Sequence, residues 1–297
     1  RLVIANATGC SSVWASWTPS MPYCVNEDGE GPAWGNSLFE DNAEYGFGIS
    51  QAYAHRKKAA LALVKEILQI DQKNAAAADT ASSGGEERAG GGGALALSDP
   101  LRTGLASYVY LCEEVPHDPL LQQVLPHLRR EKHKHAKLQL LYDCREFLTK
   151  VSHWMVGGDG WAYDIGFGGL DHVLHSGKDN VKILVLDTEV YSNTGGQASK
   201  ATPMGAQVKF AEMGKATPQK DLAQYAMGMR DVYVASVCLQ ANPEQTLRAM
   251  LEAESYPGPA LIVAYAPCIA HGYKMSESID HCRTAVIATD SSGGEVT

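Results

Sequence analysis

The chain has 297 residues, a formal net charge of −9 and seven cysteines. The acidic balance argues against nucleic acid as the main partner. No apolar run is long enough to cross a bilayer, so we expect no membrane partner either. The cysteines form no Cys-x-x-Cys pair and no dense pattern. This argues against a secreted disulfide scaffold and favours reduced thiols in the cytoplasm.

The N-terminal part predicts a strand, a long loop and a helix. Residues 2–5 form a short apolar run typical of a buried first strand. Residues 14–37 mix prolines, glycines and aromatic residues, which indicates a long and therefore functional loop. Asp41 and Glu44 have the spacing of a capping box, so we expect a helix from there to about Gln72.

The middle of the chain predicts an insertion. Residues 75–93 consist mainly of Ala and Gly and cannot bury enough apolar surface to become ordered. From about 100 to 150, leucines recur at helical spacing. We expect one domain whose core is interrupted by this stretch. Its segments are a core at about 1–72 and 148–273, an insertion at about 73–147, and a tail without predicted structure at 274–297.

From residue 151 onward, apolar runs of strand length alternate with helix-like segments. Such alternation is typical of a parallel sheet with right-handed crossovers. We expect the strand at 2–5 to join this sheet, which gives an α/β fold. The expected strands are 153–156, 181–186, 232–237 and 260–265, and the expected helices are 163–175, 222–229 and 243–254.

Two polar loops directly follow two of these apolar runs. One is Gly158-Asp159-Gly160-Trp161, and the other covers residues 187–196. In a parallel sheet, both loops lie at the carboxyl edge, where α/β proteins bind ligands. A Gly-Asp-Gly turn that leads into a helix offers backbone N–H groups to a phosphate.

A phosphate beside a carboxylate requires a cation between them. Mg²⁺ suits this role because it prefers oxygen ligands and retains a diphosphate in its shell. We expect Asp159 to bind the ion, together with oxygens of Thr188 and the Val190 carbonyl. The alternative for Asp159 is a helix N-cap, and the two roles are compatible.

The two loops resemble the thiamine diphosphate signature and, with their flanks, the pyruvate:ferredoxin (flavodoxin) oxidoreductase family. The similar segments are GDGWAYDIG at 158–166 and DTEVYSNTGGQASKATP at 187–203. The resemblance covers two segments of the chain, residues 5–48 and about 154–273. It implies a thiamine diphosphate-binding C-terminal domain with Asn193 at the reactive end of the cofactor. The implied cofactor residues are Cys10, Gly158, Asp159, Gly160, Trp161, Thr188, Glu189, Val190, Tyr191, Ser192 and Asn193.

The resemblance also implies a [4Fe-4S] cluster held by four cysteines. Cys10 matches the third ligand and Cys268 the fourth, while the first two would lie in a segment preceding Arg1. Two thiolates cannot hold such a cluster alone, and the alternative for each is a small buried thiol. We expect His271 to be a packing or surface residue and not a metal ligand.

The implied reaction is the oxidative decarboxylation of pyruvate with coenzyme A to acetyl-CoA and CO₂. Electrons would pass through the cluster to ferredoxin or flavodoxin, in a homodimer that contains the remaining domains of the enzyme. The location would be the cytoplasm or an anaerobic organelle. One alternative is a thiamine-dependent 2-oxoacid decarboxylase or synthase without a cluster, which bound iron and sulfide would distinguish. The other is an inactive fragment that serves as an assembly module.

Overall fold

The computed structural model forms two compact units. The first comprises Arg1–Ser50 and Ser152–Thr297, and the second comprises Gln51–Val151. Cys10, residues 82–93 of the Ala/Gly-rich stretch and residues 291–294 of the tail lie outside the described residues. The structure describes residues 1–9, 11–12, 25, 27, 31–81, 95–111, 118–177, 180–286, 288–289 and 295–296.

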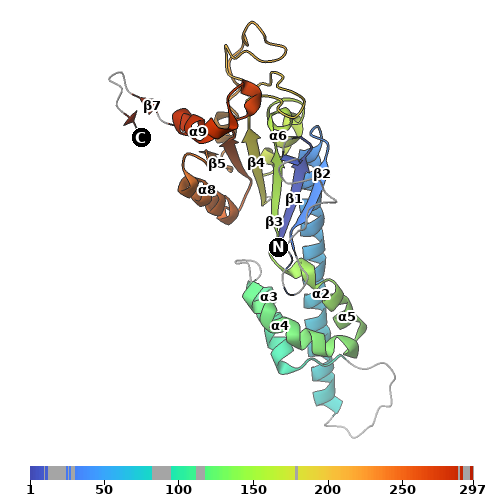
Figure 1. Ribbon diagram of the computed structural model, residues 1–297. Coiled ribbons are helices and arrows are strands. Elements are labelled where there is room, and N and C mark those ends of the chain that lie inside the picture. The colour runs from blue at the N-terminus through green and yellow to red at the C-terminus, as the bar shows by residue number, and fades with distance from the viewer. Residues whose placement is uncertain are drawn as a thin grey trace. The chain divides into compact units, whose positions relative to one another are not determined.

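The first unit is built on a six-stranded sheet in the order β2-β1-β3-β4-β6-β5 (Figure 1). All five strand pairs are parallel, so the carboxyl ends of all six strands share one edge. The strands are β1 Leu2–Ala7, β2 Ala33–Ser37, β3 Ser152–Gly157, β4 Val181–Asp187, β5 Tyr233–Val237 and β6 Ala260–Tyr265. The prediction of an α/β fold with a parallel sheet is confirmed.

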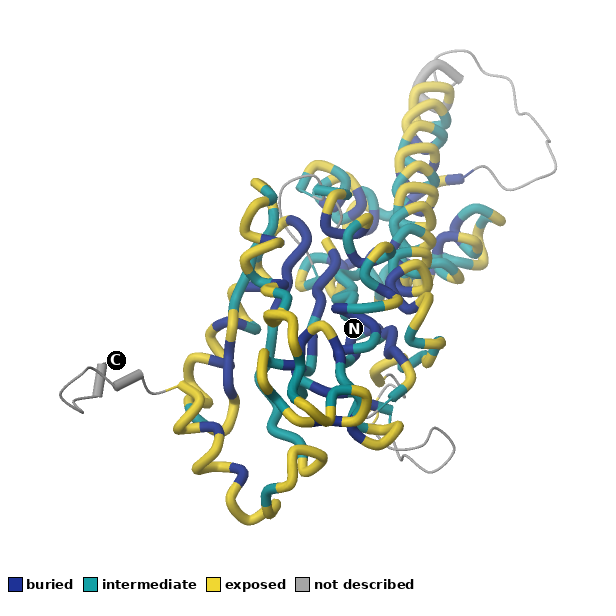
Figure 2. Tube along the Cα trace, turned by 90° about the horizontal axis from the view of Figure 1, so that it is seen from above, coloured by how far each residue is buried: buried dark blue, intermediate teal, exposed yellow. Residues whose placement is uncertain are grey.

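Helices cover both faces of this sheet because its central strands are apolar on both sides. In β4, the side chains of Ile183 and Val185 pack with α6 and α7 on one face of the sheet. The side chain of Leu184 belongs to the cluster with α8 on the other face. Figure 2 shows the central strands as largely buried tubes among partly exposed helices. These helices are α6 Phe167–His175, α7 Leu222–Met227 and α8 Pro243–Ser255.

The strand β2 corrects the prediction of an uninterrupted loop at 14–37. It pairs with β1 from Val3–Ala33 to Ala7–Ser37. Its residues are exposed or half-buried, as expected at the edge of a sheet. Backbone pairing therefore defines this strand, and no apolar run marks it in the sequence.

The second unit contains a cluster of buried leucines, including Leu101, Leu121, Leu128 and Leu138. The long helix α2 begins in the first unit and continues into this one. It ends at Ala81 and not near residue 72, because the alanines that follow are the best helix formers. The elements are α2 Asn42–Ala81, α3 Asp99–Leu111, α4 Asp118–Glu131, η1 Lys132–Lys134, α5 Ala136–Asp143 and η2 Arg145–Leu148. The prediction of helix at 100–150 is thus confirmed for most of the described residues, 100–111 and 118–148.

Two further differences concern the C-terminal half. The helix expected at 163–175 is divided into a π-helical turn, η3 Gly160–Asp164, and α6. The expected tail contains η5 Met275–Glu277 and α9 Ser278–Val286. The short pair β7 Ala288–Thr289 and β8 Glu295–Val296 follows. Among the helices that the structure describes, none has the length and apolar character needed to cross a membrane.

Candidate functional site

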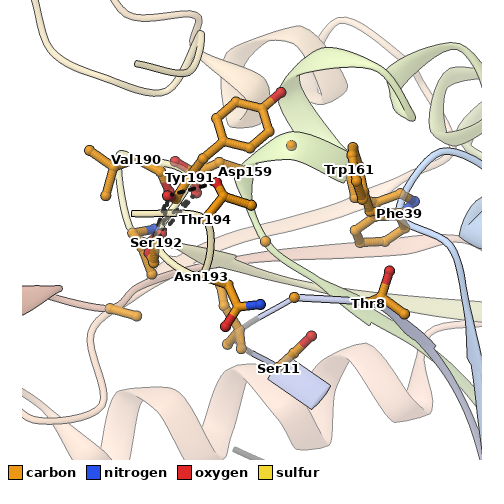
Figure 3. A pocket seen from close by; sticks show the side chains of 16 residues that line it. Thr8, Ser11, Phe39, Asp159, Trp161, Val190, Tyr191, Ser192, Asn193 and Thr194 are labelled. Carbon is orange, nitrogen blue, oxygen red and sulfur yellow. Dashed lines mark hydrogen bonds between the residues drawn. The ribbon is translucent and has the colours of Figure 1, made fainter. Parts of the chain in front are cut away.

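A cavity of about 400 Å³ lies at the carboxyl edge of the sheet in the first unit (Figure 3). It brings together most of the residues that the two polar loops predicted, with additions from the segments after β1 and β2. Glu189 and Cys268 do not line it. The lining residues are Thr8, Gly9, Ser11, Phe39, Gly158, Asp159, Gly160, Trp161, Leu186, Thr188, Val190, Tyr191, Ser192, Asn193, Thr194 and Ala266.

The carboxylate of Asp159 is held from both sides. Its Oδ1 accepts a hydrogen bond from the Thr188 N–H at 3.0 Å, and its Oδ2 accepts one from the Ser199 hydroxyl at 2.9 Å. Asp159 precedes η3, but its side chain makes no capping hydrogen bond to that turn. The N-cap alternative is therefore wrong, and the carboxylate is oriented by Thr188 in the second loop and by Ser199 after it.

Three oxygens cluster beside the cavity. The Thr188 Oγ1 lies 2.9 Å from the Val190 carbonyl oxygen and 3.5 Å from Asp159 Oδ1. Adjacent ligands of an octahedral Mg²⁺ at its usual bond length are about 2.9 Å apart. The Ser192 hydroxyl contacts the same cluster, 2.8 Å from Thr188 Oγ1. The donor set thus fits a small hard cation.

A cation here would depend on a single carboxylate. Within the described residues, no group of three or more His, Cys, Asp and Glu side chains is arranged to hold a metal ion. A hydroxyl and a carbonyl oxygen carry no net charge, so the remaining ligands would come from water or from an anionic ligand. This composition suits Mg²⁺ bound to a diphosphate, because Mg²⁺ is usually held by one or two carboxylates and by substrate phosphates.

Burial makes this carboxylate costly to ionise without a cation. Burial, and secondarily the nearby Asp187, raises the pKa of Asp159 well above its ordinary value. Burial also raises the pKa of Asp187, which accepts a hydrogen bond from the Tyr163 hydroxyl at 2.8 Å. Two buried acids side by side form an electrostatic environment that a divalent cation would relieve.

Glu189 shapes the cation loop, which we define as residues 187–196. Its φ of 60° places it in the left-handed region that a side chain normally avoids. Its N–H bonds Asp187 Oδ1 at 3.2 Å, and its carbonyl accepts the Thr202 hydroxyl at 2.5 Å. The bend at Glu189 lies between Thr188 and Val190, whose oxygens meet. Glu189 therefore acts through the backbone and not as a lining residue.

Asn193 lines the cavity within a tight turn of the cation loop. The Gly195 N–H bonds the Ser192 carbonyl at 3.1 Å, and the Gly196 N–H bonds the Tyr191 carbonyl at 2.9 Å. Both glycines have positive φ, so the turn requires them. In Figure 3 the Asn193 side chain lies between the rest of this loop and Ser11.

Cys268 lies close to the cavity but outside its lining. It precedes the short helix η4 Ile269–His271, where its Sγ accepts the Ala270 N–H at 3.4 Å. The thiol is half-buried, and Ala266, two residues earlier, lines the cavity. Because Cys10 lies outside the described residues, the structure places only one of the two expected cluster ligands.

Sequence reasoning missed several residues at this site. Ser199 lies 40 positions from Asp159 in the chain, yet it holds that carboxylate. Phe39 lines the cavity from the segment after β2. Thr8 and Ser11 also line it, but they belong to the small-residue polar turn after the first strand, which is of a kind that meets phosphates or clusters. The only sequence signal for Ser199 is its position inside the similar segment at 187–203.

The fold and this cavity define an α/β domain with a ligand site at the carboxyl edge of its parallel sheet. Residues 146–264 match the family model of the thiamine pyrophosphate enzyme C-terminal TPP binding domain. Thiamine pyrophosphate is the same compound as thiamine diphosphate. The matched residues contain Asp159, the cation loop and Ser199, but not the segments after β1 and β2.

Curated relatives define the family more closely. "Pyruvate:ferredoxin oxidoreductase" of Moorella thermoacetica is 46% identical over 97% of this chain and 23% of its own length. "Pyruvate-flavodoxin oxidoreductase" of Klebsiella pneumoniae is 49% identical over 92% and 21%. "Pyruvate dehydrogenase [NADP(+)]" of Cryptosporidium parvum is 49% identical over 92% and 15%. Over more than nine-tenths of its length the chain is similar to pyruvate:ferredoxin (flavodoxin) oxidoreductases, as its motifs predicted, and it spans 15–23% of the length of these relatives.

A solved 2-oxoglutarate:ferredoxin oxidoreductase from Magnetococcus marinus aligns over 43% of each chain. The TM-score is 0.37 and the identity is 21%. This likeness is too slight to support an assignment.

Proposed function

We propose that this chain binds thiamine diphosphate through Mg²⁺ as part of a pyruvate:ferredoxin or pyruvate-flavodoxin oxidoreductase. The observation that carries the proposal is the cluster of three oxygens from Asp159, Thr188 and Val190 beside the cavity. The matching family model and the names of the relatives support it.

In this proposal, Asp159, Thr188 and Val190 hold the cation, and the diphosphate completes its shell. Ser192 orients the Thr188 hydroxyl through its hydrogen bond. Around Gly158, little would obstruct a close approach, because a Cβ there would meet only the Leu186 carbonyl oxygen, at 3.7 Å. The backbone of the Gly-Asp-Gly turn can therefore come close to a phosphate.

The rest of the cavity would orient the cofactor and its substrate. Bound thiamine diphosphate supplies the nucleophile for a 2-oxoacid and the electron sink for decarboxylation. In this proposal, Asn193 donates or accepts a hydrogen bond at the reactive end of the cofactor. Phe39, Trp161 and Leu186 add apolar surface to the cavity, which limits water.

The complete reaction requires more than this chain. We propose that Cys268 and Cys10 contribute to a [4Fe-4S] cluster whose other ligands come from elsewhere in the enzyme. Coenzyme A, ferredoxin or flavodoxin, and a second copy in a homodimer belong to the same proposal, as does a cytoplasmic location. The cluster-free alternative remains distinguishable by iron and sulfide analysis, and the names of the relatives favour the oxidoreductase.

The test is a calorimetric titration of the chain with thiamine diphosphate, in Mg²⁺ and in EDTA. We expect binding that requires Mg²⁺ and that Asp159→Ala abolishes. Asp280→Ala is the matched control, because Asp280 is an exposed acid on α9 that pairs with Arg283 in its own helix. Binding that is equally strong in EDTA, or unchanged by Asp159→Ala, would refute the proposed site.

A further inference from the structure

The side chain of His271 joins two loops of the first unit. Its Nε2 lies 3.0 Å from the carbonyl oxygen of Thr188. A carbonyl can only accept, so Nε2 carries the proton and donates it. His271 is the last residue of η4, which starts directly after Cys268. The bond therefore links the cation loop to the segment that contains this cysteine.

Two further contacts join the same segments. The Ala266 N–H bonds the Asp187 carbonyl at 2.9 Å, at the beginning of the cation loop. A Cβ on Gly196, at its end, would lie 3.3 Å from the Cβ of Ala270. The loop after β6 thus lies close to both ends of the cation loop, with a hydrogen bond at Asp187 and a close approach at Gly196. His271 adds a hydrogen bond at Thr188.

This bond completes the fixation of Thr188. Its N–H bonds Asp159 and its Oγ1 donates to the Val190 carbonyl, so the His271 bond engages the third polar group. The same peptide unit leads into Glu189, whose left-handed conformation stores backbone strain. Without His271, this peptide loses the hydrogen bond at its carbonyl and keeps the longer bond from the Glu189 N–H to Asp187 Oδ1, at 3.2 Å, so it can rotate more easily toward a less strained conformation.

We propose that His271 is a positioning residue for the cation. It fixes the orientation of the peptide between Thr188 and Glu189. This peptide in turn determines how the Thr188 hydroxyl lies next to the Val190 carbonyl oxygen. The inference rests on the proposed function, because it concerns the same cation site. It assigns His271 no direct contact with the ion.

The test compares His271→Ala with His271→Gln in the same chain. The Gln amide nitrogen reaches about as far as Nε2 and can donate the same hydrogen bond. His175→Ala is the control, since His175 is exposed and contacts Asp171 on its own helix. The measurements are the thiamine diphosphate dissociation constant at limiting Mg²⁺, the melting temperature, and amide hydrogen exchange of residues 188–196 in EDTA.

We expect His271→Ala to weaken binding about 10-fold, at the lower end for residues that orient metal ligands. Exchange in 188–196 should accelerate, whereas the melting temperature should hardly change because the bond is exposed. His271→Gln should restore both binding and slow exchange. Equal behaviour of the Ala and Gln variants, or wild-type binding and exchange in His271→Ala, would overturn the proposal.

The two proposals can fail separately. If the wild-type chain binds no thiamine diphosphate, the proposed function of this chain fails, and exchange in EDTA still decides the role of His271. Faster exchange at 188–196 in His271→Ala, with protection in His271→Gln, would then support positioning of the loop. Unchanged exchange in both would refute it.

Discussion

The hydroxyl of Ser199 donates a hydrogen bond that holds the Oδ2 oxygen of Asp159 in place. It lies 2.9 Å from Asp159 Oδ2, and it also accepts the Ala201 N–H at 3.0 Å. Ser199 itself is 4% exposed, so water cannot easily replace it. Ser199→Ala would therefore remove these two buried hydrogen bonds at once, one of them to a carboxylate, together with a longer contact of 3.4 Å to Thr202 Oγ1.

The cost can be worked out from these two bonds. A hydrogen bond to a charged group contributes about 1.5–3 kcal/mol and a neutral one about 1 kcal/mol, so the free energy of unfolding should fall by about 2.5–4 kcal/mol. For a unit of roughly 200 residues, this corresponds to a decrease of about 5–16 °C in melting temperature. Loss of orientation at Asp159 should also weaken Mg²⁺-dependent cofactor binding about 10- to 100-fold.

The assay is thermal and urea unfolding of Ser199→Ala, followed by calorimetric titration with thiamine diphosphate and Mg²⁺ at a temperature where the variant is folded. Ser255→Ala is the control, because Ser255 is exposed at the end of α8 and its hydroxyl donates to the Glu252 carbonyl of its own helix. A Ser199→Ala chain that melts and binds like wild type would refute the role of this hydroxyl.

Two glycine substitutions and a change of pH should each alter the stability of the chain in a defined direction. Gly160→Ala would place a Cβ 2.4 Å from the Tyr191 ring and should destabilise the chain by about 1–3 kcal/mol in urea unfolding. Gly168→Ala meets no atom within 4 Å and should instead stabilise α6 by up to about 1 kcal/mol; the same sign for both would contradict this reasoning. Burial, with Asp187, raises the pKa of Asp159, so in EDTA this group binds its proton more tightly in the folded chain than in the unfolded one, and it adds a fall to the dependence of stability on pH. The stability of the chain should fall as the pH rises from the ordinary value of 3.8 through the raised pKa, and a fall of the same size in Asp159→Asn would contradict the assignment.

The sequence predicted the part of the site that depends on strand ends. The apolar runs before Asp159 and before the cation loop form β3 and β4, which are neighbours in the sheet. Because both strands are parallel, the two loops meet at one edge, as the strand–helix alternation indicated. The positions of strands follow from the local apolar pattern. These positions were sufficient to predict that Asp159 and Thr188 lie close together.

The remaining features depend on contacts that a single sequence does not encode locally. The strand β2 carries no apolar run, because one edge of it remains unpaired in the sheet. Ser199 reaches Asp159 only through the path of the chain after the cation loop. His271 was expected to be a packing or surface residue. It is exposed, but its partner is the backbone of Thr188, so no pairing of side-chain types indicated the contact.

The central claim is that one cation binds where the oxygens of Asp159, Thr188 and Val190 meet. The most direct measurement is anomalous diffraction from crystals grown with thiamine diphosphate and Mn²⁺, which accepts the same oxygen ligands as Mg²⁺. The expected result is a single Mn²⁺ peak within bonding distance of those three oxygens and of the diphosphate. A Mn²⁺ peak elsewhere, or a diphosphate bound in this cavity without any metal at these oxygens, would contradict the claim.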